Sequence, residues 1–412
     1  MRGRPLLYSS YEADQALLNS TTKRVFAVLF LVLLALVPFG VLPGLGFLAE
    51  ESWLRTLSSV AIFAIGGLGM NILFGLAGQV SLGHAFFMGI GAYVAAVLGA
   101  DPAGRYFGLG LPIWIWLPAA GVVAALVGVA IGPTAVRVRG LYLAVVTLGL
   151  VFIGDYAFRN LDTITGGSEL GRTFPPLDLR LWKEEAPLIN VSTDGTWLGV
   201  DLTSEAKTYF ALLALAVMFV VFAKNLQRTR VGRAFMSIRD RDVAAEIMGV
   251  DEVRYKLLAF GISSFFAGVS GALLASFVGS VIPERWDLFL SVEFIAIVLI
   301  GGAGTVSGTL LGAAFVTILP RVVQEFTQWM QGVVEAADSP IASVLDVVVA
   351  TDSTDFGLVN TLPGVGPGLS VFQLNQVIYG LLIIGFLIFE PFGLYGIWIR
   401  VRNYWKGWPF TY

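Results

Sequence analysis

The chain alternates between long apolar runs and short polar segments. A helix needs about 20 apolar residues to cross the hydrocarbon core of a bilayer, so each run predicts one transmembrane helix. The pattern therefore predicts an all-α integral membrane protein, a polytopic bundle of about ten transmembrane helices, some of them short or broken. The predicted spans are residues 25–49, 54–77, 80–100, 111–131, 140–158, 208–223, 257–280, 288–300, 305–319 and 372–389.

Two of these spans, 288–300 and 305–319, are short and are joined by the glycine-rich segment Gly301-Gly302-Ala303-Gly304. They form either two tilted helices or one broken, re-entrant pair. Inside a bilayer, non-helical backbone is tolerated only where protein or a water-filled cavity shelters it. We therefore expect this break to lie in the interior of the bundle.

The charged residues orient the predicted bundle, because cytoplasmic loops of membrane proteins carry an excess of lysine and arginine. Segment 224–256 is rich in both, whereas segments 159–206 and 324–371 are acidic on balance. We predict that both termini are cytoplasmic and that the two acidic segments are outside insertions of short helices or irregular loops. The predicted organisation is a cytoplasmic N-terminal segment 1–24, a permease domain 25–400 with its coupling loop at 224–256, and a cytoplasmic tail 401–412.

Composition narrows the chemistry that the chain can perform. Apolar residues make up 56% of the sequence and charged residues 13%, about half the charged share of a soluble domain. The chain has no cysteine and one histidine, which excludes disulfides, thiolate metal sites and multi-histidine sites. A net charge of −3 gives no reason to expect nucleic-acid binding. We expect no cofactor, no metal and no catalytic residue.

The basic loop contains the most informative motif of the sequence. Asp240 or Asp242 can cap the start of a helix, and Gly249 suits the position just after its end. Such a short amphipathic helix lies on the membrane surface, packs on its own bundle, or docks into a groove of a partner. Its small residues, Ala244 and Ala245, favour docking. The apolar face is predicted to hold Val243, Ala244, Ile247 and Met248, and the docking segment to comprise Arg241, Asp242, Val243, Ala244, Ala245, Ile247, Met248 and Gly249.

A second group of candidate residues lies where the spans 54–77 and 80–100 meet. Polar residues inside spans are costly and often functional. Glycines in this stretch allow an interrupted helix, so the polar side chains either line a translocation pathway or bond neighbouring helices together. The predicted pathway residues are Asn71, Gln79, Ser81 and His84.

The docking motif resembles a known one. The spacing Ala244-Ala245-Xaa-Xaa-Xaa-Gly249 resembles the EAA loop of ABC-importer permeases, with Val243 at the glutamate position. Further stretches resemble, in the same order along the chain, the M-type permease of branched-chain amino-acid (LIV) importers. Two features depart from that family: Leu170 and Gly171 are reversed in its outer-loop motif, and the insertion 324–371 is longer. The resembling stretches are 66–93, 139–149, 256–271, 301–312 and 390–397.

The resemblance implies a permease subunit of an ATP-driven importer in the bacterial plasma (inner) membrane. Such a subunit forms the pathway for branched-chain or other hydrophobic amino acids, which an extracytoplasmic substrate-binding protein delivers. Its other implied partners are ABC ATPase subunits and a second, homologous permease, which would form a heterodimer with this chain. Because the sequence has no Gly-Xaa-Xaa-Xaa-Xaa-Gly-Lys-Ser/Thr loop, ATP hydrolysis would belong to separate chains.

Other functions remain open at this stage. A urea or short-amide importer would share the same permease architecture. An ion-coupled secondary carrier usually holds acidic residues at the membrane midplane, and none is obvious in this sequence. An intramembrane enzyme would need a nucleophile with its base, paired carboxylates or a metal site, and one histidine with scattered acids does not supply them.

Overall fold

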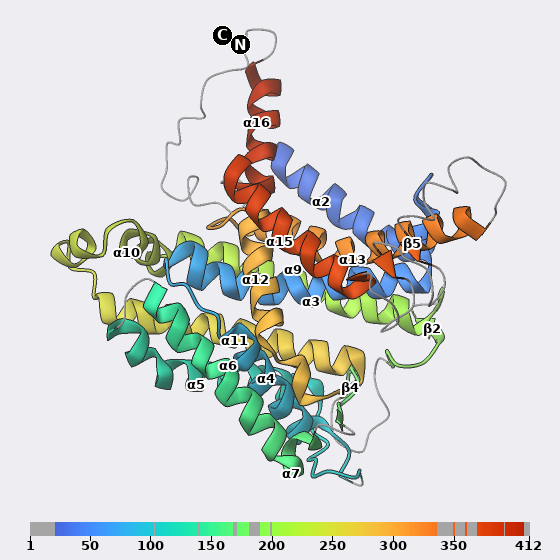
Figure 1. Cartoon of the computed structure of the whole chain (residues 1–412), viewed down its shortest axis with the longest axis horizontal. Helices are drawn as coiled ribbons and strands as arrows, with labels where there is room; N and C mark the ends of the chain where they lie inside the picture. The colour runs from blue at the N-terminus through green and yellow to red at the C-terminus, as the bar shows by residue number, and fades with distance from the viewer. Residues whose placement is uncertain are drawn as a thin grey trace.

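The computed structural model describes residues 21–102, 104–137, 141–167, 171–180, 190–197, 200–335, 349–350, 359–360, 369–390 and 392–407. Helices dominate them, and each predicted span contains one, which confirms the all-α prediction (Figure 1). These helices are α2 (Thr21–Leu36), α3 (Glu51–Met70), α4 (His84–Gly99), α5 (Ile113–Arg137), α6 (Leu141–Asn160), α9 (Ser204–Arg228), α11 (Glu252–Val278), α12 (Leu288–Gly301), α13 (Val306–Glu335) and α15 (Val371–Phe389).

The helices have the dimensions of a membrane protein. Among the described residues, 7 helices are long and apolar enough to cross a membrane. Two shorter ones, α4 with 16 residues and α12 with 14, pack inside the same body. Three further helices stand outside the predicted spans: α7 (Asp162–Thr165), α10 (Arg230–Ile247) and α16 (Gly393–Gly407). The chain is a multi-pass, all-α membrane protein.

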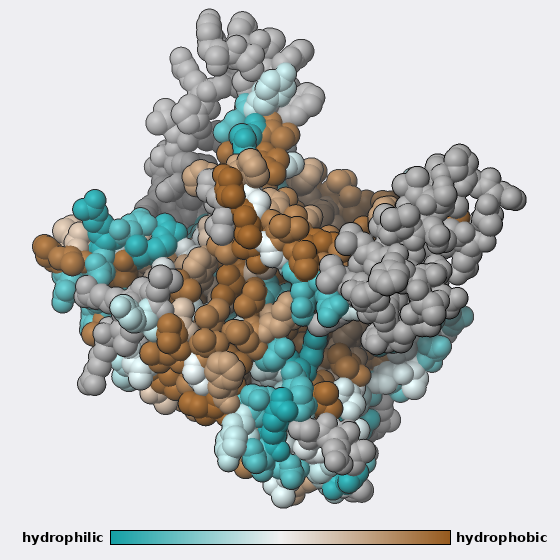
Figure 2. Space-filling model, in the orientation of Figure 1, coloured by the Kyte–Doolittle hydropathy of each residue, from teal (hydrophilic) through white to brown (hydrophobic). Residues whose placement is uncertain are grey.

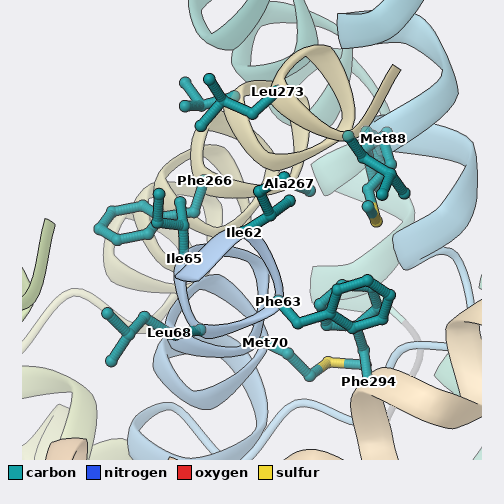
Figure 3. Close-up of a cluster of buried hydrophobic side chains, with 14 of the residues drawn as sticks. Ile62, Phe63, Ile65, Leu68, Met70, Met88, Phe266, Ala267, Leu273 and Phe294 are labelled. Atoms are coloured by element: carbon teal, nitrogen blue, oxygen red, sulfur yellow. The ribbon is translucent and has the colours of Figure 1, made fainter. Parts of the chain in front are cut away.

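The core of the bundle is built around α11, which packs against α3, α4 and α5. Small residues permit the close packing: a side chain at Gly271 of α11 would overlap the backbone of Met88 on α4. Bulky side chains fill the space beyond these contacts, with Ile65 of α3 beside Phe266 of α11 and Phe63 of α3 stacked on Phe294 of α12 (Figure 3). Close packing of this kind is what holds helices together where lipid removes the hydrophobic driving force.

The outward faces of the helices are also apolar. Large side chains such as Phe26 on α2, Phe152 on α6 and Leu381 on α15 are more than half exposed. Figure 2 shows hydrophobic residues across the middle of the molecule and hydrophilic residues toward α10 and along the opposite, lower right border. An apolar girdle of this kind matches a body that is surrounded by lipid.

Helix α10 lies at the left end of the molecule in Figure 1, whereas the labelled strands β2, β4 and β5 lie to the right of its centre. The described strands of the two acidic insertions are thus separated from α10 of the coupling loop, and the side of the membrane on which each segment lies stays a prediction. The strands pair as β1 (Arg172–Thr173) with β4 (Ser280–Val281) and β2 (Gly195–Trp197) with β3 (Val200–Leu202), both antiparallel, and as β5 (Val349–Ala350), β6 (Val359–Asn360) and β7 (Leu369–Ser370) in parallel.

Two predicted spans depart most from the observed helices. The run 25–49 is helical only to Leu36, because Pro38 and the left-handed Gly40 turn the chain into the short helices η1 (Val37–Phe39) and η2 (Gly46–Ala49). Conversely, α13 does not stop near Leu319 but continues into the insertion 324–371, which we expected to hold short helices or loops. The apolar periodicity continues past Pro320 through Val322, Val323, Phe326 and Met330.

Candidate functional site

The helix α10 is divided by a kink at Arg241, whose backbone is extended (φ −158°, ψ 100°). Of the two candidate caps, Asp242 accepts a hydrogen bond from the N–H of Val243 at 2.8 Å, whereas Asp240 pairs with Arg239. The segment after the kink is thus a separate short helix at one end of the molecule (Figure 1), where hydrophilic residues gather (Figure 2).

This short helix ends in a Schellman motif. Gly249 has φ +84°, and its N–H donates to the carbonyl of Glu246 at 2.9 Å. The N–H of Val250 donates to the carbonyl of Ala245 at 3.0 Å. Gly249 therefore occupies the C′ position that the sequence predicts for it, and the chain turns there into α11.

The apolar face predicted for this helix is exposed. Val243 is 58% exposed, Ile247 81% and Met248 84%, and Ala244 is exposed as well. Ala245 differs from our expectation, because it is buried within its own chain at 5% exposure. Its methyl group points inward because it lies on the opposite side of the helix from Val243 and Ile247, so it anchors the helix instead of presenting a docking surface.

The junction of α3 and α4 is interrupted, as the glycines there predict. After Met70 the helix loosens into the π-helical segment η3 (Asn71–Leu76), in which Ala77 N–H donates to the Ile72 carbonyl at 3.1 Å. Gly78 then takes φ +69°, and α4 begins at His84. Such π-helical turns recur at functional sites of helices.

A second interruption separates α12 from α13. Gly302 and Gly304 both have positive φ (119° and 81°), and Gly301 and Gly302 are buried, which confirms the predicted interior position of this part of the break. The two segments are separate helices that run in different directions (Figure 1).

The two interruptions meet each other. The side-chain oxygen of Asn71 accepts a hydrogen bond from the backbone N–H of Gly304 at 2.7 Å. A side chain at Gly75 would overlap that same N–H group, so the two backbones are in direct contact. Two side chains from elsewhere complete the junction: Gln227 donates to the Gly304 carbonyl at 2.9 Å, and Arg239 donates to the Gly75 carbonyl at 2.7 Å. We call Asn71, Gly75, Gln227, Arg239 and Gly304 the break junction.

The other predicted pathway residues, Gln79, Ser81 and His84, are also buried in the protein interior. Ser81 is 3% exposed, and its hydroxyl accepts from the Gly83 N–H at 3.2 Å. His84, also 3% exposed, bonds to the backbone of Gly66, and its ring centroid lies 4.7 Å from that of Phe294. The contacts of His84 join α4 to α3 and α12, whereas the Ser81 bond is local, and among the described residues Nε2 of His84 has no hydrogen-bond partner. A pathway role for both residues remains a prediction.

Gln79 stands apart from the other pathway candidates. It is 4% exposed, and among the described residues neither atom of its side-chain amide has a hydrogen-bond partner. Its backbone N–H donates to the Leu73 carbonyl at 3.0 Å and thereby fixes its place in the interruption. A buried amide with free bonding capacity is costly to maintain, which makes Gln79 the strongest pathway candidate of the four.

Sequence reasoning missed the groups that complete these interruptions. Thr147 of α6 accepts from the Leu82 N–H at 2.8 Å, and Ser291 of α12 accepts from the Ala85 N–H at 3.0 Å. The N–H of Ala85 is one of the donors that the start of α4 leaves free, and Leu82 lies in the non-helical stretch just before that helix. A single hydroxyl residue within an apolar run could have marked Thr147 and Ser291 as hydrogen-bonding groups. The sequence does not show which interrupted backbone each of them bonds.

Known proteins with similar sequences show which family the chain belongs to. The profile of a family described as "Branched-chain amino acid transport system / permease component" matches residues 52–387. The chain belongs to this permease family. The match begins within α3 and ends within α15, and it includes both interruptions and α10.

Individual relatives of this permease are similar over much of their length. The chain is 34% identical over 319 residues to the high-affinity branched-chain amino acid transport system permease protein LivM of Escherichia coli (strain K12), across 76% of this chain and 71% of the relative. The protein of the same name from Salmonella typhimurium is 32% identical over 291 residues, across 69% and 66%. The ribose import permease protein RbsC of Haemophilus influenzae is 21% identical over 332 residues, across 78% and 93%. No solved structure matches the chain.

Proposed function

We propose that this permease is the transmembrane subunit of an ATP-driven ABC importer. It forms the translocation pathway for branched-chain or other hydrophobic amino acids that a soluble binding protein delivers. The observation that carries the proposal is the exposed apolar helix after Arg241, at one end of a bundle that belongs to a transport-permease family.

The exposure pattern of this helix favours docking over the two other uses of an amphipathic helix. A helix that merely packs on its own bundle buries its apolar side, yet Val243, Ile247 and Met248 remain exposed while Ala245 alone is buried. A helix that lies on the membrane belongs beside the apolar girdle, whereas this one stands at the hydrophilic end of the molecule (Figure 2). Exposed apolar patches rimmed by polar residues mark protein interaction sites.

The partner of this surface is proposed to be an ATPase subunit. The sequence contains no phosphate-binding loop of the Gly-Xaa-Xaa-Xaa-Xaa-Gly-Lys-Ser/Thr type, so an ATP-driven permease of this composition takes its energy from a separate chain. We further propose a second, homologous permease beside this one, and a binding protein at the end that carries the strands.

The proposed substrate follows the relatives' names. The two LivM proteins, at 34% and 32% identity, are named for branched-chain amino acids, whereas the ribose permease is 21% identical. A urea or short-amide importer is the substrate alternative, and uptake competition separates the two. Reconstituted complex should import labelled leucine, and unlabelled valine or isoleucine should compete while urea does not.

The docking surface offers a matched pair of variants. Val243→Asp places a charge on the exposed face of the short helix. Val41→Asp makes the same change at a valine that is 67% exposed in the turn between η1 and η2. We expect Val243→Asp to release the ATPase subunits during purification in mild detergent, because burying an unpaired charge in an interface is costly. Val41→Asp should copurify normally. Full ATPase association with Val243→Asp and Ile247→Asp would refute this docking site.

A further inference from the structure

Arg239 connects the coupling segment to the membrane interior. Its Nη1 donates to the carbonyl oxygen of Gly75 at 2.7 Å, across a sequence separation of 164 residues. Its Nε and Nη2 both donate to the same carboxylate oxygen of Asp240, at 3.0 and 2.9 Å. The guanidinium is therefore held by its neighbour on α10 while it reaches into the α3–α4 interruption.

The Gly75 carbonyl is a natural acceptor for a cation. It lies in the last turn of η3, where the carbonyls of a helix end lack intrahelical partners and carry the negative end of the helix dipole. A hydrogen bond from a charged donor is stronger than one between neutral groups. Arg239 thus acts as a cap that is supplied from outside the helix.

The contact between α10 and the interruption is tight. A Cβ atom at Gly78 would lie 2.7 Å from Cγ of Arg239 and 3.2 Å from its Cα. Because Gly78 also has φ +69°, glycine at this position meets both a backbone and a space requirement. A displacement of Arg239 therefore requires the backbone at Gly78 to move as well.

The second interruption is within reach of the same guanidinium. A Cβ atom at Gly304 would lie 3.0 Å from Nη1 of Arg239, and the Gly304 N–H is bonded to Asn71. Gln227, near the end of α9, donates to the Gly304 carbonyl. The junction of both breaks is thus closed by side chains from the helices that lead into the coupling loop.

We propose that Arg239 is a positioning residue that transmits movement of the coupling helix to the two interrupted membrane helices. The inference rests on the proposed function of the short helix as the ATPase contact. Asp240 alone separates Arg239 from Arg241, where the docking segment begins. A peptide backbone of this length cannot absorb a large displacement, so the force on the docked helix reaches the Gly75 carbonyl through Arg239.

The test compares three variants in the full complex, reconstituted with its ATPase subunits, second permease and binding protein. Arg239→Ala removes the contact. Arg239→Lys keeps the positive charge but has all its donors on one nitrogen. Arg230→Ala removes the same charge from the other end of α10. We expect all three to retain ATPase association, because the docking face is unchanged. Leucine uptake per ATP hydrolysed should fall about tenfold or more in Arg239→Ala, partly recover in Arg239→Lys, and stay at the native value in Arg230→Ala.

A thiol reporter gives a second readout that a merely structural role would not move. The natural chain has no cysteine, so a single cysteine at Gln79 is the only thiol in this subunit. We expect its maleimide labelling to change between the nucleotide-free and the ATP-bound complex, and the change to disappear with Arg239→Ala in a complex that still assembles and still hydrolyses ATP.

The possible outcomes separate the two proposals. Native coupling and native nucleotide-dependent labelling in Arg239→Ala would overturn the role of Arg239. This conclusion would leave the docking proposal intact, provided that Val243→Asp still releases the ATPase. If Arg239→Ala fails to assemble, Arg239→Lys decides, since an unchanged uptake-to-hydrolysis ratio in that variant also overturns the proposal.

Discussion

Asn71 of η3 accepts a hydrogen bond from the backbone N–H of Gly304 at 2.7 Å, and this contact joins two helix interruptions that are 233 residues apart in the chain. Each interruption alone would leave polar backbone groups without partners in a lipid environment. Because the two interruptions are in contact, Asn71 of one provides a hydrogen-bond acceptor for a backbone N–H of the other. Their contact lies beside α10, which carries the proposed ATPase contact.

The bond between Asn71 and Gly304 should contribute measurably to stability. Asn71→Leu leaves the Gly304 N–H without its acceptor in a site where Asn71 is 1% exposed. We expect a loss of about 1–3 kcal/mol in the free energy of unfolding, the usual cost of a buried unpaired donor. The measurement is the melting temperature of the purified chain in detergent. An unchanged value would show that the contact contributes nothing to the fold.

Gln79→Leu serves as the matched contrast. Since the side-chain amide of Gln79 has no partner among the described residues, its replacement by leucine should leave the melting temperature unchanged or raise it. If Gln79 lines the pathway, the same variant should slow leucine uptake in a complex that still assembles. Native uptake would return Gln79 to a purely structural role.

Gly271 should be intolerant of any side chain. A methyl group there would overlap the backbone of Met88, so Gly271→Ala must separate α11 from α4. We expect a loss of about 1–3 kcal/mol, the usual cost of overpacking, measured again as a lower melting temperature. Gly385→Ala is the control, because nothing lies within 4 Å of a Cβ atom at that helical position of α15. That variant should be neutral or slightly stabilising.

Gly249 tests the geometry of the coupling helix without any steric conflict. A Cβ atom there meets nothing within 4 Å, but φ +84° is unfavourable for alanine by about 1–2 kcal/mol. Gly249→Ala should therefore weaken the end of the helix and lower substrate-stimulated ATP hydrolysis while the bundle remains folded. Gly149→Ala, at an open position within α6, is the control and should behave as the native protein. Equal hydrolysis in both variants would mean that the helix end does not matter for coupling.

The docking helix shows what local sequence can and cannot predict. The spacing of Val243, Ile247 and Met248 fixes one apolar face, and Gly249 fixes the helix end, because both depend only on residues within two turns. That Ala245 faces inward depends on where the bundle lies relative to the helix, which local sequence does not contain. A bulky residue at Ala245 would therefore disturb the chain's own packing.

The sequence by itself determined most of the helices and the two glycine-rich places where helices are interrupted. Apolar runs of about the length of the bilayer must be helical in lipid, and glycine clusters are where that constraint can be relaxed. Only the tertiary structure decided which breaks meet. A hydrogen bond such as that from Arg239 to Gly75, or from Gly304 to Asn71, links residues far apart in the chain through a backbone group. Backbone groups are identical in every residue, so no pattern of side chains specifies such a pairing before the helices are packed.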